Sequence, residues 1–425
     1  MDDIFDGRVA VVGLGYIGLP TAAALATQGI DVIGVDVNPD TVKAVMYGQV
    51  PFVEPDLAVA VSGAVAIGRL TATSEMPEAD AFIIAVPTPF NDDRTADLSF
   101  VRSAAESIAP RLRVGDLVLL ESTSPPGTAL ALSQWLADLR PDLQLPHATD
   151  GKPDVYVAHC PERVLPGRIM VEIVTNDRVI GGITRRCAER AAALYRVFCQ
   201  GKILLTDAAS AEMAKLVENA YRDVNIAFAN ELSLICESLN LDVWEVIAMA
   251  NHHPRVNILS PGPGVGGHCI AVDPWFIVGA APELSRLIRT AREVNDRKPQ
   301  HVAEQVIAKA NRFRSPTIAC LGLTFKANVD DARESPAVDV VAAIIAGAPE
   351  ARILLSDPYV DHLPQELEGH ENVELVATNL SVEQADIVVL LVDHDQFRSM
   401  NRTRLNGKIV YDTRGAFRSR VKWSA

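Results

Sequence analysis

Residues 9–29 read VAVVGLGYIGLPTAAALATQG, which is a short apolar run, a glycine-rich turn and then a segment typical of a helix. Three glycines in the turn, Gly13, Gly15 and Gly18, have the spacing GxGxxG. Between a strand and a helix, the first glycine permits a tight turn and the second lets the backbone approach a pyrophosphate. The third lets the helix pack closely on the strand. The stretch therefore predicts a strand–turn–helix unit that binds a dinucleotide.

Other residues around this turn indicate which dinucleotide binds. The turn also contains Tyr16 and Ile17, whose backbone lies where the start of the helix offers amides to phosphates. Asp36 ends the next apolar run, and an acid there hydrogen-bonds a ribose 2′-hydroxyl and repels a 2′-phosphate. Thr88 and Thr123 follow later apolar runs, at the strand ends where open α/β sheets bind ligands. We expect NAD as the cofactor, with these residues in contact with it.

Apolar runs alternate with helical patterns through the first half of the chain and again after about residue 314. Residues 206–300 interrupt the alternation. Within them, residues 206–239 have apolar positions every three or four residues and neither Pro nor Gly, which predicts one long helix or two nearly continuous ones. We therefore expect an α/β protein with two Rossmann-like doubly wound lobes joined by a long central helical segment. The expected domains are residues 1–205 (NAD binding), 206–312 (central helical) and 313–425 (C-terminal α/β).

Composition excludes several classes of protein. The chain has 425 residues, more than one core usually serves, and its net charge of -15 is interspersed with basic residues, which argues against nucleic-acid or membrane-surface binding. The apolar runs are too short to span a bilayer, and we see no export signal. The six cysteines have no disulfide or metal-site spacing. We expect a cytoplasmic protein with no bound metal.

The densest unusual segment is residues 252–274, in which four glycines lie close to Cys269. Glycine and proline disfavour helices and strands, so this segment should be a loop. Glycines in a loop also let its backbone approach a ligand closely. From the residues alone, Cys269 is equally an inert core thiol or a nucleophile. Lys215 and Asn219, spaced i,i+4 on the predicted helix, either converge on a ligand or form a solvated face, and Glu162 is either catalytic or an ordinary strand-end acid.

Four segments carry a family resemblance over essentially the whole chain. They are GLGYIGLP at 13–20, ESTSPPG at 121–127, CPERVLPG at 160–167 and GPGVGGHCIAVDP at 262–274. In this order they resemble the UDP-glucose/GDP-mannose dehydrogenase family. The resemblance implies NAD-dependent oxidation of the C6 alcohol of a UDP-sugar to a carboxylate, with two NAD consumed. The wider segments 160–182 and 252–278 resemble the branch that oxidises UDP-N-acetyl-D-mannosamine for bacterial surface polysaccharides.

The resemblance also implies roles for residues. It makes Cys269 the nucleophile that carries a thiohemiacetal and then a thioester, Lys215 the acid/base or oxyanion-stabilising group and Asn219 its hydrogen-bonding companion. It links Glu162 to water activation, with Thr123 and Asp273 in support. The positions that resemble those lining the family's substrate site are Arg163, Val164, Lys215, Asn219, Arg222, His253, Arg255, Gly266, Phe325, Lys326, Arg333 and Arg414. The arginines among them can bind a diphosphate.

Three alternatives stay open at this point. The sugar can instead be that of UDP-N-acetylglucosamine or UDP-glucose, since the same residues would serve. A two-electron dehydrogenase of small hydroxy acids, or a non-catalytic NAD-binding scaffold, would also use the first lobe.

The long helix must bury an apolar stripe, and the family resemblance implies a homodimer formed through it.

Overall fold

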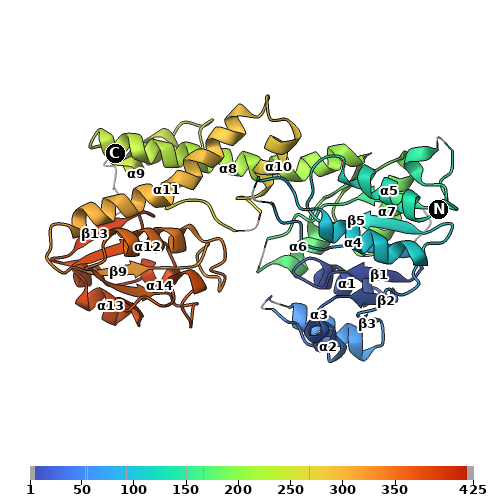
Figure 1. Cartoon of the computed structure of the whole chain (residues 1–425), viewed down its shortest axis with the longest axis horizontal. Coiled ribbons are helices and arrows are strands. Elements are labelled where there is room, and N and C mark those ends of the chain that lie inside the picture. The colour runs from blue at the N-terminus through green and yellow to red at the C-terminus, as the bar shows by residue number, and fades with distance from the viewer. Residues whose placement is uncertain are drawn as a thin grey trace. The chain divides into compact units, whose positions relative to one another are not determined.

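The structure is a computed structural model, which describes residues 5–418 except Val53, Pro55, Asp92, Asp150, Pro166 and His268. The chain divides into two compact units, Met1–Glu218 and Asn219–Ala425. Each unit is built on a sheet flanked by helices (Figure 1). Helix α8 (Ala208–Ser238) contains the boundary between the units, and its length confirms a single continuous helix where the sequence allowed one or two.

The first unit has an eight-stranded sheet in the order β3-β2-β1-β4-β5-β6-β7-β8. Its strands are β1 (Val9–Val12), β2 (Val32–Val35), β3 (Leu70–Thr73), β4 (Ala81–Ile84), β5 (Leu117–Leu120), β6 (Tyr156–His159), β7 (Arg178–Gly182) and β8 (Ile203–Asp207). All neighbouring pairs are parallel except β6 and β7, which run antiparallel. From β1 the sheet is built outward through β2 and β3, and from β4 it is built in the opposite direction through β5 and β6. The carboxyl ends of β1 and β4 therefore form the topological switch point.

Helices cover both faces of this sheet. They are α1 (Gly18–Thr27), α2 (Pro39–Met46), α3 (Leu57–Ala66), α4 (Ser99–Ile108), α5 (Thr128–Leu139), α6 (Ile169–Thr175) and α7 (Arg185–Tyr195), with 3-10 turns at Ala109–Arg111 and Pro146–Ala148. Alternate residues of one strand enter different cores: Val9 and Val11 pack with residues of α1, α3 and α7, whereas Ala10 and Val12 pack with α4 and α5. Burial on both faces explains the continuous apolar runs of these strands.

The second unit has a five-stranded, all-parallel sheet in the order β11-β10-β9-β12-β13. Its strands are β9 (Thr317–Leu321), β10 (Arg352–Ser356), β11 (Val373–Leu375), β12 (Ile387–Leu390) and β13 (Ile409–Asp412). Its helices are α9 (Val243–Ala250), α10 (Asp273–Ala280), α11 (Arg286–Ala310), α12 (Pro336–Gly347), α13 (Thr378–Gln384) and α14 (Asp395–Arg398), with 3-10 turns at Gln365–Leu367 and Arg402–Leu405. Helices α12 and α13 lie on opposite faces of β9 (Figure 1). Two doubly wound α/β lobes with a long helical segment between them in the chain are thus confirmed.

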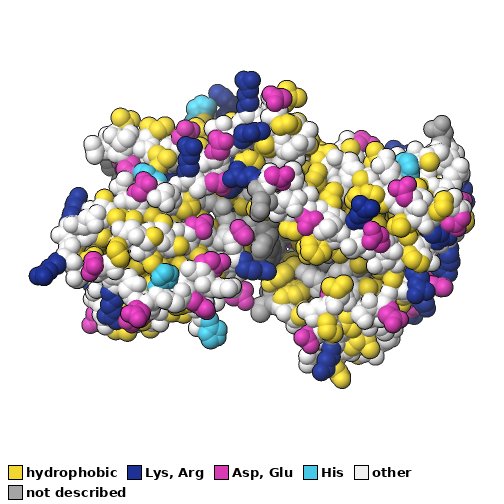
Figure 2. Space-filling model, viewed as in Figure 1, with side chains coloured by type: hydrophobic (Ala, Val, Ile, Leu, Met, Phe, Trp, Pro, Cys, Tyr) yellow, Lys and Arg dark blue, Asp and Glu magenta, His cyan; other side chains and the backbone are white. Residues whose placement is uncertain are grey.

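The surface has mixed charge. On the face shown in Figure 2, basic and acidic side chains are interspersed over both units, as the sequence suggested. None of the helices in the described part of the chain combines the length and the apolar character that crossing a lipid bilayer requires.

Candidate active site

The turn after β1 is anchored by the acid that follows β2. Gly13 has a φ of 94°, and its N–H donates to the carbonyl of Val35 at 2.8 Å. One carboxylate oxygen of Asp36 accepts the N–H of Leu14 at 2.8 Å, and the other accepts the N–H of Asn38 at 2.9 Å. These bonds use only part of the accepting capacity of the carboxylate. Asp36 is therefore held beside the glycine turn with lone pairs left for a ribose hydroxyl.

The glycines of this turn differ in the space around them. A Cβ on Gly18 would lie 1.8 Å from the carbonyl oxygen of Gly13, so this glycine is required by the packing of α1. A Cβ on Gly15 would meet no atom within 4 Å. The N-cap Ile17 makes no side-chain capping bond to α1. Leu19 donates its N–H to the carbonyl of Gly15 at 3.2 Å and Pro20 has no N–H, so of the first-turn residues Gly18 keeps its amide for a ligand. Tyr16 is exposed and stacks on Phe52, with ring centroids 4.2 Å apart. The first unit thus fits a dinucleotide pyrophosphate.

The second unit repeats the turn without the open glycine. Gly322 follows β9 with a φ of 96°, and Asp357, which follows β10, accepts the N–H of Leu323 at 2.7 Å. The position that corresponds to Gly15 is Thr324, which is fully buried. His394 contacts the same carboxylate oxygen of Asp357, with its Nε2 3.0 Å away. The second lobe therefore keeps the architecture of the turn but not the approach that a pyrophosphate needs.

Two predicted cofactor contacts meet at the switch point. The hydroxyl of Thr88, beyond β4, donates to the backbone carbonyl of Thr123, beyond β5, at 2.6 Å. Both threonines are half-buried. Their strands are hydrogen-bonded neighbours, which is why residues 35 positions apart come together. The hydroxyl of Ser122 donates to the carbonyl of Val86 at 2.7 Å and ties the same two loops.

Glu162 is buried and paired with an arginine that the sequence analysis missed. Its Oε2 accepts from Nη2 of Arg178 at 3.1 Å, and its Oε1 accepts the N–H of Arg163 at 2.7 Å. Arg178 also lies 3.9 Å from Glu121, a buried carboxyl at the end of β5. The only signal in the sequence is a basic residue at the start of the apolar strand β7. Glu162 is thus part of a buried charge cluster and is not an ordinary surface acid.

Arg163 and Val164 follow Glu162 along the same loop. The guanidinium of Arg163 pairs with Glu218 of α8 at 2.5 Å and donates to the carbonyl of Asp177 at 3.2 Å. Val164 is half-buried and packs against the apolar core of the first unit. The Arg163 guanidinium keeps further N–H groups beyond these contacts, as binding of a second anion would need.

Asn219, Cys269 and Asp273 come together in the second unit. Asp273 is the first residue of α10, it is 2 % exposed, and its Oδ2 accepts from Nδ2 of Asn219 at 2.5 Å. The N–H of Asp273 donates to the carbonyl of Cys269 at 2.8 Å, which fixes one turn between the thiol and the carboxylate. Cys269 itself is exposed. A reactive thiol must be reachable by its substrate, so this exposure argues against an inert core cysteine.

Helix α8 presents the neighbouring polar residues. Lys215 lies one turn before Asn219, and both are half-buried. Arg222 lies further along the same helix and is exposed. Thr123, Glu162 and Lys215 belong to the first unit, whereas Asn219 and Cys269 belong to the second.

The glycine loop before Cys269 packs on the second lobe. A Cβ on Gly266 would lie 2.2 Å from the carbonyl oxygen of Glu334, and one on Gly267 would lie 3.1 Å from the ring of Phe325. A Cβ on Gly262 would lie 2.5 Å from Nη1 of Arg414. The loop is therefore glycine-rich because protein atoms already surround it. Packing places it against two predicted substrate residues, Phe325 and Arg414.

Four other predicted substrate residues are exposed. Lys326 and Arg333 lie in the segment after β9, where Arg333 forms a bidentate pair with Asp331 at 2.9 and 2.7 Å. His253 and Arg255 lie in the turn after α9, and the ring Nδ1 of His253 accepts the N–H of Arg255 at 3.3 Å. His268, next to the thiol, lies outside the described residues.

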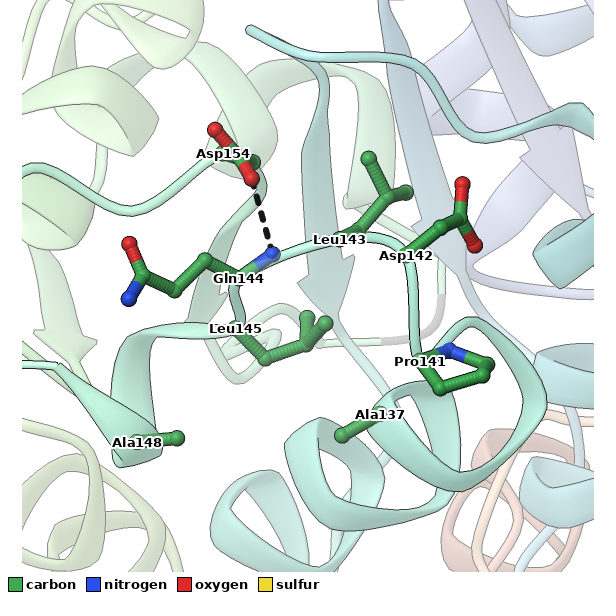
Figure 3. Close-up of a pocket in the computed structure, with 8 residues that line it drawn as sticks. All are labelled: Ala137, Pro141, Asp142, Leu143, Gln144, Leu145, Ala148 and Asp154. Atoms are coloured by element: carbon green, nitrogen blue, oxygen red, sulfur yellow. Dashed lines mark hydrogen bonds between the residues drawn. The ribbon is translucent and has the colours of Figure 1, made fainter.

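The described part of the chain holds no candidate metal site and one hollow away from the predicted site residues. Across the described ranges of the chain, no cluster of three His, Cys, Asp or Glu side chains could hold a metal ion. A hollow of about 480 Å³ is lined by residues of the segment 137–154, including Leu143, Gln144 and Asp154 (Figure 3). Of its two acids, Asp154 accepts the N–H of Gln144 at 2.8 Å and Asp142 pairs with Arg140 at 2.7 Å, and the hollow contains none of the predicted site residues. We assign no function to this hollow.

Comparison with known proteins agrees with these features along the whole chain. Residues 7–199 match the NAD binding domain of the UDP-glucose/GDP-mannose dehydrogenase family. Residues 209–297 match the central domain of that family, and residues 319–419 match its UDP binding domain.

Individual relatives span nearly their full lengths. The chain is 56% identical to an NDP-N-acetyl-D-galactosaminuronic acid dehydrogenase of Ralstonia nicotianae, over 100% of this chain and 98% of the relative. It is 53% identical to a UDP-N-acetyl-D-mannosamine dehydrogenase of Yersinia pestis, over 96% of this chain and 99% of the relative. The solved structure of a UDP-D-ManNAc dehydrogenase from Pyrococcus horikoshii superimposes with a TM-score of 0.85 at 39% identity, covering 96% of each chain.

The resemblance expected from the sequence motifs is confirmed, as are NAD as cofactor and a UDP-sugar as substrate. This chain belongs to the UDP-glucose/GDP-mannose dehydrogenase family and is an NAD-dependent nucleotide-sugar dehydrogenase.

Proposed function

We propose that the enzyme oxidises the C6 alcohol of a UDP-N-acetyl-D-hexosamine to the carboxylate, with UDP-N-acetyl-D-mannosamine as its substrate and Cys269 as its nucleophile. The observation that carries this proposal is the exposed Cys269 held one turn from Asp273, which in turn binds Asn219. An oxidation that stopped at the aldehyde would need no thiol. A hydride can leave an aldehyde carbon only after a nucleophile has added to it.

The second oxidation and the hydrolysis follow from this addition. The Cys269 sulfur bonds to the aldehyde carbon while the oxygen gains a proton, which gives a thiohemiacetal. Bound NAD supplies the hydride acceptor in both oxidations, so two NAD are consumed per sugar. The resulting thioester is cleaved by water, which forms the carboxylate and releases the thiol. Overall, the alcohol, two NAD⁺ and one water give the carboxylate, two NADH and three protons.

The remaining residues have assigned roles in these steps. We place Lys215 as the acid/base or oxyanion-stabilising group at the C6 oxygen and Asn219 as its hydrogen-bonding companion. Glu162 takes the proton of the hydrolytic water, and Thr123 and Asp273 orient the water and the thiol. Asp36, Thr88 and the turn at 13–18 hold NAD, and the other residues that the family resemblance implied line the UDP-sugar site.

The names of the relatives bear on the sugar. A relative at 53% identity is named for UDP-N-acetyl-D-mannosamine and one at 56% for an N-acetyl-D-galactosaminuronic acid, so an N-acetylated hexosamine is common to both. Oxidation of UDP-N-acetyl-D-galactosamine is therefore the second candidate. We propose that the uronate product serves synthesis of bacterial surface polysaccharides and that the enzyme works in the reducing cytoplasm, where Cys269 stays a thiol.

We propose three functional parts of the chain. Residues 1–205 bind NAD, residues 206–312 form the central helical segment, and residues 313–425 form the C-terminal α/β domain.

We also propose a homodimer formed through α8. Tyr221, Phe228 and Ile235 repeat every seven residues on this helix and are 71%, 55% and 48% exposed. An apolar stripe of this kind is stabilised by burial against a partner. Sedimentation velocity measures the oligomeric state in solution. The unaltered chain should sediment as a dimer, and the double variant Tyr221→Ser/Phe228→Ser should sediment as a monomer.

A single assay tests the central proposal. NADH formed per sugar is measured for the UDP forms of N-acetyl-mannosamine, N-acetyl-galactosamine, N-acetylglucosamine and glucose, alongside kcat/KM for each. We expect two NADH per sugar, the highest kcat/KM on UDP-N-acetyl-D-mannosamine, and no acid product from Cys269→Ala. One NADH per sugar with full activity of Cys269→Ala would instead indicate a two-electron dehydrogenase. Binding of NAD and sugar without turnover would indicate a scaffold.

A further inference from the structure

We propose that Arg178, which Glu121 also contacts, is a positioning residue that orients the carboxylate of Glu162 for hydrolysis of the thioester. This inference rests on the proposed function, which assigns water activation to Glu162. It adds two residues that touch neither substrate nor cofactor in that scheme.

The three side chains come from three neighbouring strands. Glu121 follows β5, Glu162 lies three residues after β6, and Arg178 is the first residue of β7. Because these strands are adjacent in the sheet, residues 16 and 57 positions from Arg178 in the sequence converge on one guanidinium. Its Nη2 donates to Glu162 at 3.1 Å, and its Nη1 lies 3.9 Å from Glu121.

The guanidinium is buried and fixed from several sides. The side chain of Arg178 is 4% exposed, and those of Glu162 and Glu121 are 7% and 0% exposed. Its Nη2 also donates to the carbonyl of Ile173 at 3.1 Å. Its plane lies over the rings of Tyr195 and Phe198, 4.7 and 5.2 Å from their centroids. Charges in such a dry site must be paired, and a pair there is held in one geometry.

Both oxygens of Glu162 are engaged, so its carboxylate plane is defined. Oε1 accepts the N–H of Arg163 at 2.7 Å and Oε2 accepts from Arg178. Each oxygen retains a further lone pair that can accept from a water. The loop that follows Glu162 is also held in place, because the buried Glu54 accepts the N–H groups of Gly167 and Ile169, both at 2.8 Å. Arg178 therefore fixes the direction in which Glu162 offers its remaining lone pairs.

Glu121 is the weaker partner of the shared guanidinium. Neutral groups also hold it, since Tyr195 and Thr21 donate their hydroxyls to it at 2.9 and 3.1 Å. Burial, together with the nearby negative charge of Glu162, raises the pKa of Glu121 to about 7. Near neutral pH, Glu121 is thus partly ionised, and its carboxylate then gives the buried guanidinium of Arg178 a second negative partner.

Two other titratable groups against Arg178, Cys160 and Tyr195, add no charge at neutral pH. Burial raises the pKa of the Cys160 thiol, 3.8 Å from Nη1 of Arg178, to about 12. Burial also raises the pKa of Tyr195 well above its usual value. The charged end of Arg163 is directed to Glu218. Arg178 and Glu121 are therefore the charged side chains that share this buried site with Glu162.

The experiment measures thioester hydrolysis as a function of pH. Full-length enzyme is mixed with NAD and UDP-N-acetyl-D-mannosamine and quenched, and the acyl adduct on Cys269 is quantified by intact mass between pH 6 and 9. In Arg178→Lys we expect the adduct to accumulate about tenfold and the acid limb of the hydrolysis rate to move up by about one pH unit, since lysine keeps the positive charge but lacks the planar guanidinium that donates to Glu162 from a fixed direction. In Glu121→Gln the limb should move the other way, because the competing anion is gone.

A matched control and a second readout separate this role from general damage. Glu212 is another buried glutamate of the first unit, and burial raises its pKa to about 7 as well, but its carboxylate binds the N–H groups of Gly127 and Ala129 instead. Glu212→Gln should leave the acid limb unchanged. The burst of first-hydride NADH should be unaffected in all three variants, because Glu162 acts only in hydrolysis.

Opposite shifts in the two variants support the inference. Equal shifts in the same direction, or none, in folded variants would overturn it, and if Arg178→Lys fails to fold then Glu121→Gln alone decides. The proposed function is tested separately on Glu162→Gln. If that variant forms no adduct and the unaltered enzyme yields one NADH per sugar, there is no thioester to hydrolyse, and both proposals fail.

Discussion

Alanine at Gly15 and at Gly18 should have opposite effects on binding and on stability. Both glycines belong to the same turn of the first unit. A Cβ on Gly18 would lie 1.8 Å from the carbonyl oxygen of Gly13, whereas a Cβ on Gly15 would meet no protein atom within 4 Å. We therefore expect Gly18→Ala to affect the fold and Gly15→Ala to affect only the bound dinucleotide.

The magnitudes follow from these distances. At Gly18 the new methyl lies far inside van der Waals contact with backbone, so α1 must move away from the turn. Overpacking of this kind costs about 1–3 kcal/mol, which lowers Tm by about 3–10 °C in a unit of this size. At Gly15 the free protein should change by less than about 0.5 kcal/mol. The methyl occupies the approach of the pyrophosphate, and we expect the Kd for NAD to rise at least about tenfold, or about 1.4 kcal/mol.

The assay pairs thermal unfolding without NAD with calorimetric titration of NAD into each variant. The expected result is a normal Tm with weakened binding for Gly15→Ala, and a lowered Tm for Gly18→Ala. The reasoning would be refuted if Gly15→Ala unfolded as early as Gly18→Ala. It would also be refuted if Gly15→Ala bound NAD as tightly as the unaltered chain.

Three further predictions concern polar side chains that are buried or half-buried. Burial raises the pKa of Glu212 to about 7, above its unfolded value, so its contribution to stability is complete below about pH 4.5 and is lost as pH rises through 7. Chemical unfolding gives the free energy of unfolding at pH 5 and at pH 8. The decrease in this free energy from pH 5 to pH 8 should be about 3 kcal/mol smaller in Glu212→Gln than in the unaltered chain, and an equal decrease in both would contradict this. Asn230→Ala should lower the free energy of unfolding by about 2–4 kcal/mol, because Asn230 is fully buried and accepts the N–H of Gly262 at 2.8 Å; a cost under 1 kcal/mol would argue against that anchor. Asn219→Ala should reduce kcat/KM at least about tenfold with little change in Tm, whereas the control Asn225→Ala, on the same helix, should keep its activity; equal losses would contradict the assigned role.

Much of the fold could be read from local patterns. The apolar runs that predicted the alternation correspond to β1, β2, β4 to β6, β9, β10, β12 and β13. Except for β13, an edge strand that is half-buried but still apolar, these strands are largely buried and read as continuously apolar. The short strands β3 and β11 were missed, since they lie at sheet edges and are only partly buried. Strand β7 begins with the buried Arg178, whose charge hides it from an apolar pattern.

The candidate site was only partly predictable. The spacing of the loop marked Cys269 and Asp273, and the helical period marked Lys215 and Asn219. No pattern showed that Asn219 would donate to Asp273, 54 positions away. Nor did the sequence explain the glycines of that loop, which we attributed to the approach of a ligand. The structure shows the carbonyl of Glu334 against Gly266 instead.

The sequence by itself determined the strand–turn–helix unit at residues 9–29, the acid at Asp36 and the α/β class of both lobes. These features depend on the local backbone and on the period of apolar residues, which neighbours in the chain specify. Only the tertiary structure decided that Glu121, Glu162 and Arg178 share one buried site. Their meeting depends on the order of strands in the sheet, and a charge that is costly to bury is stabilised only once its partners arrive from distant parts of the chain.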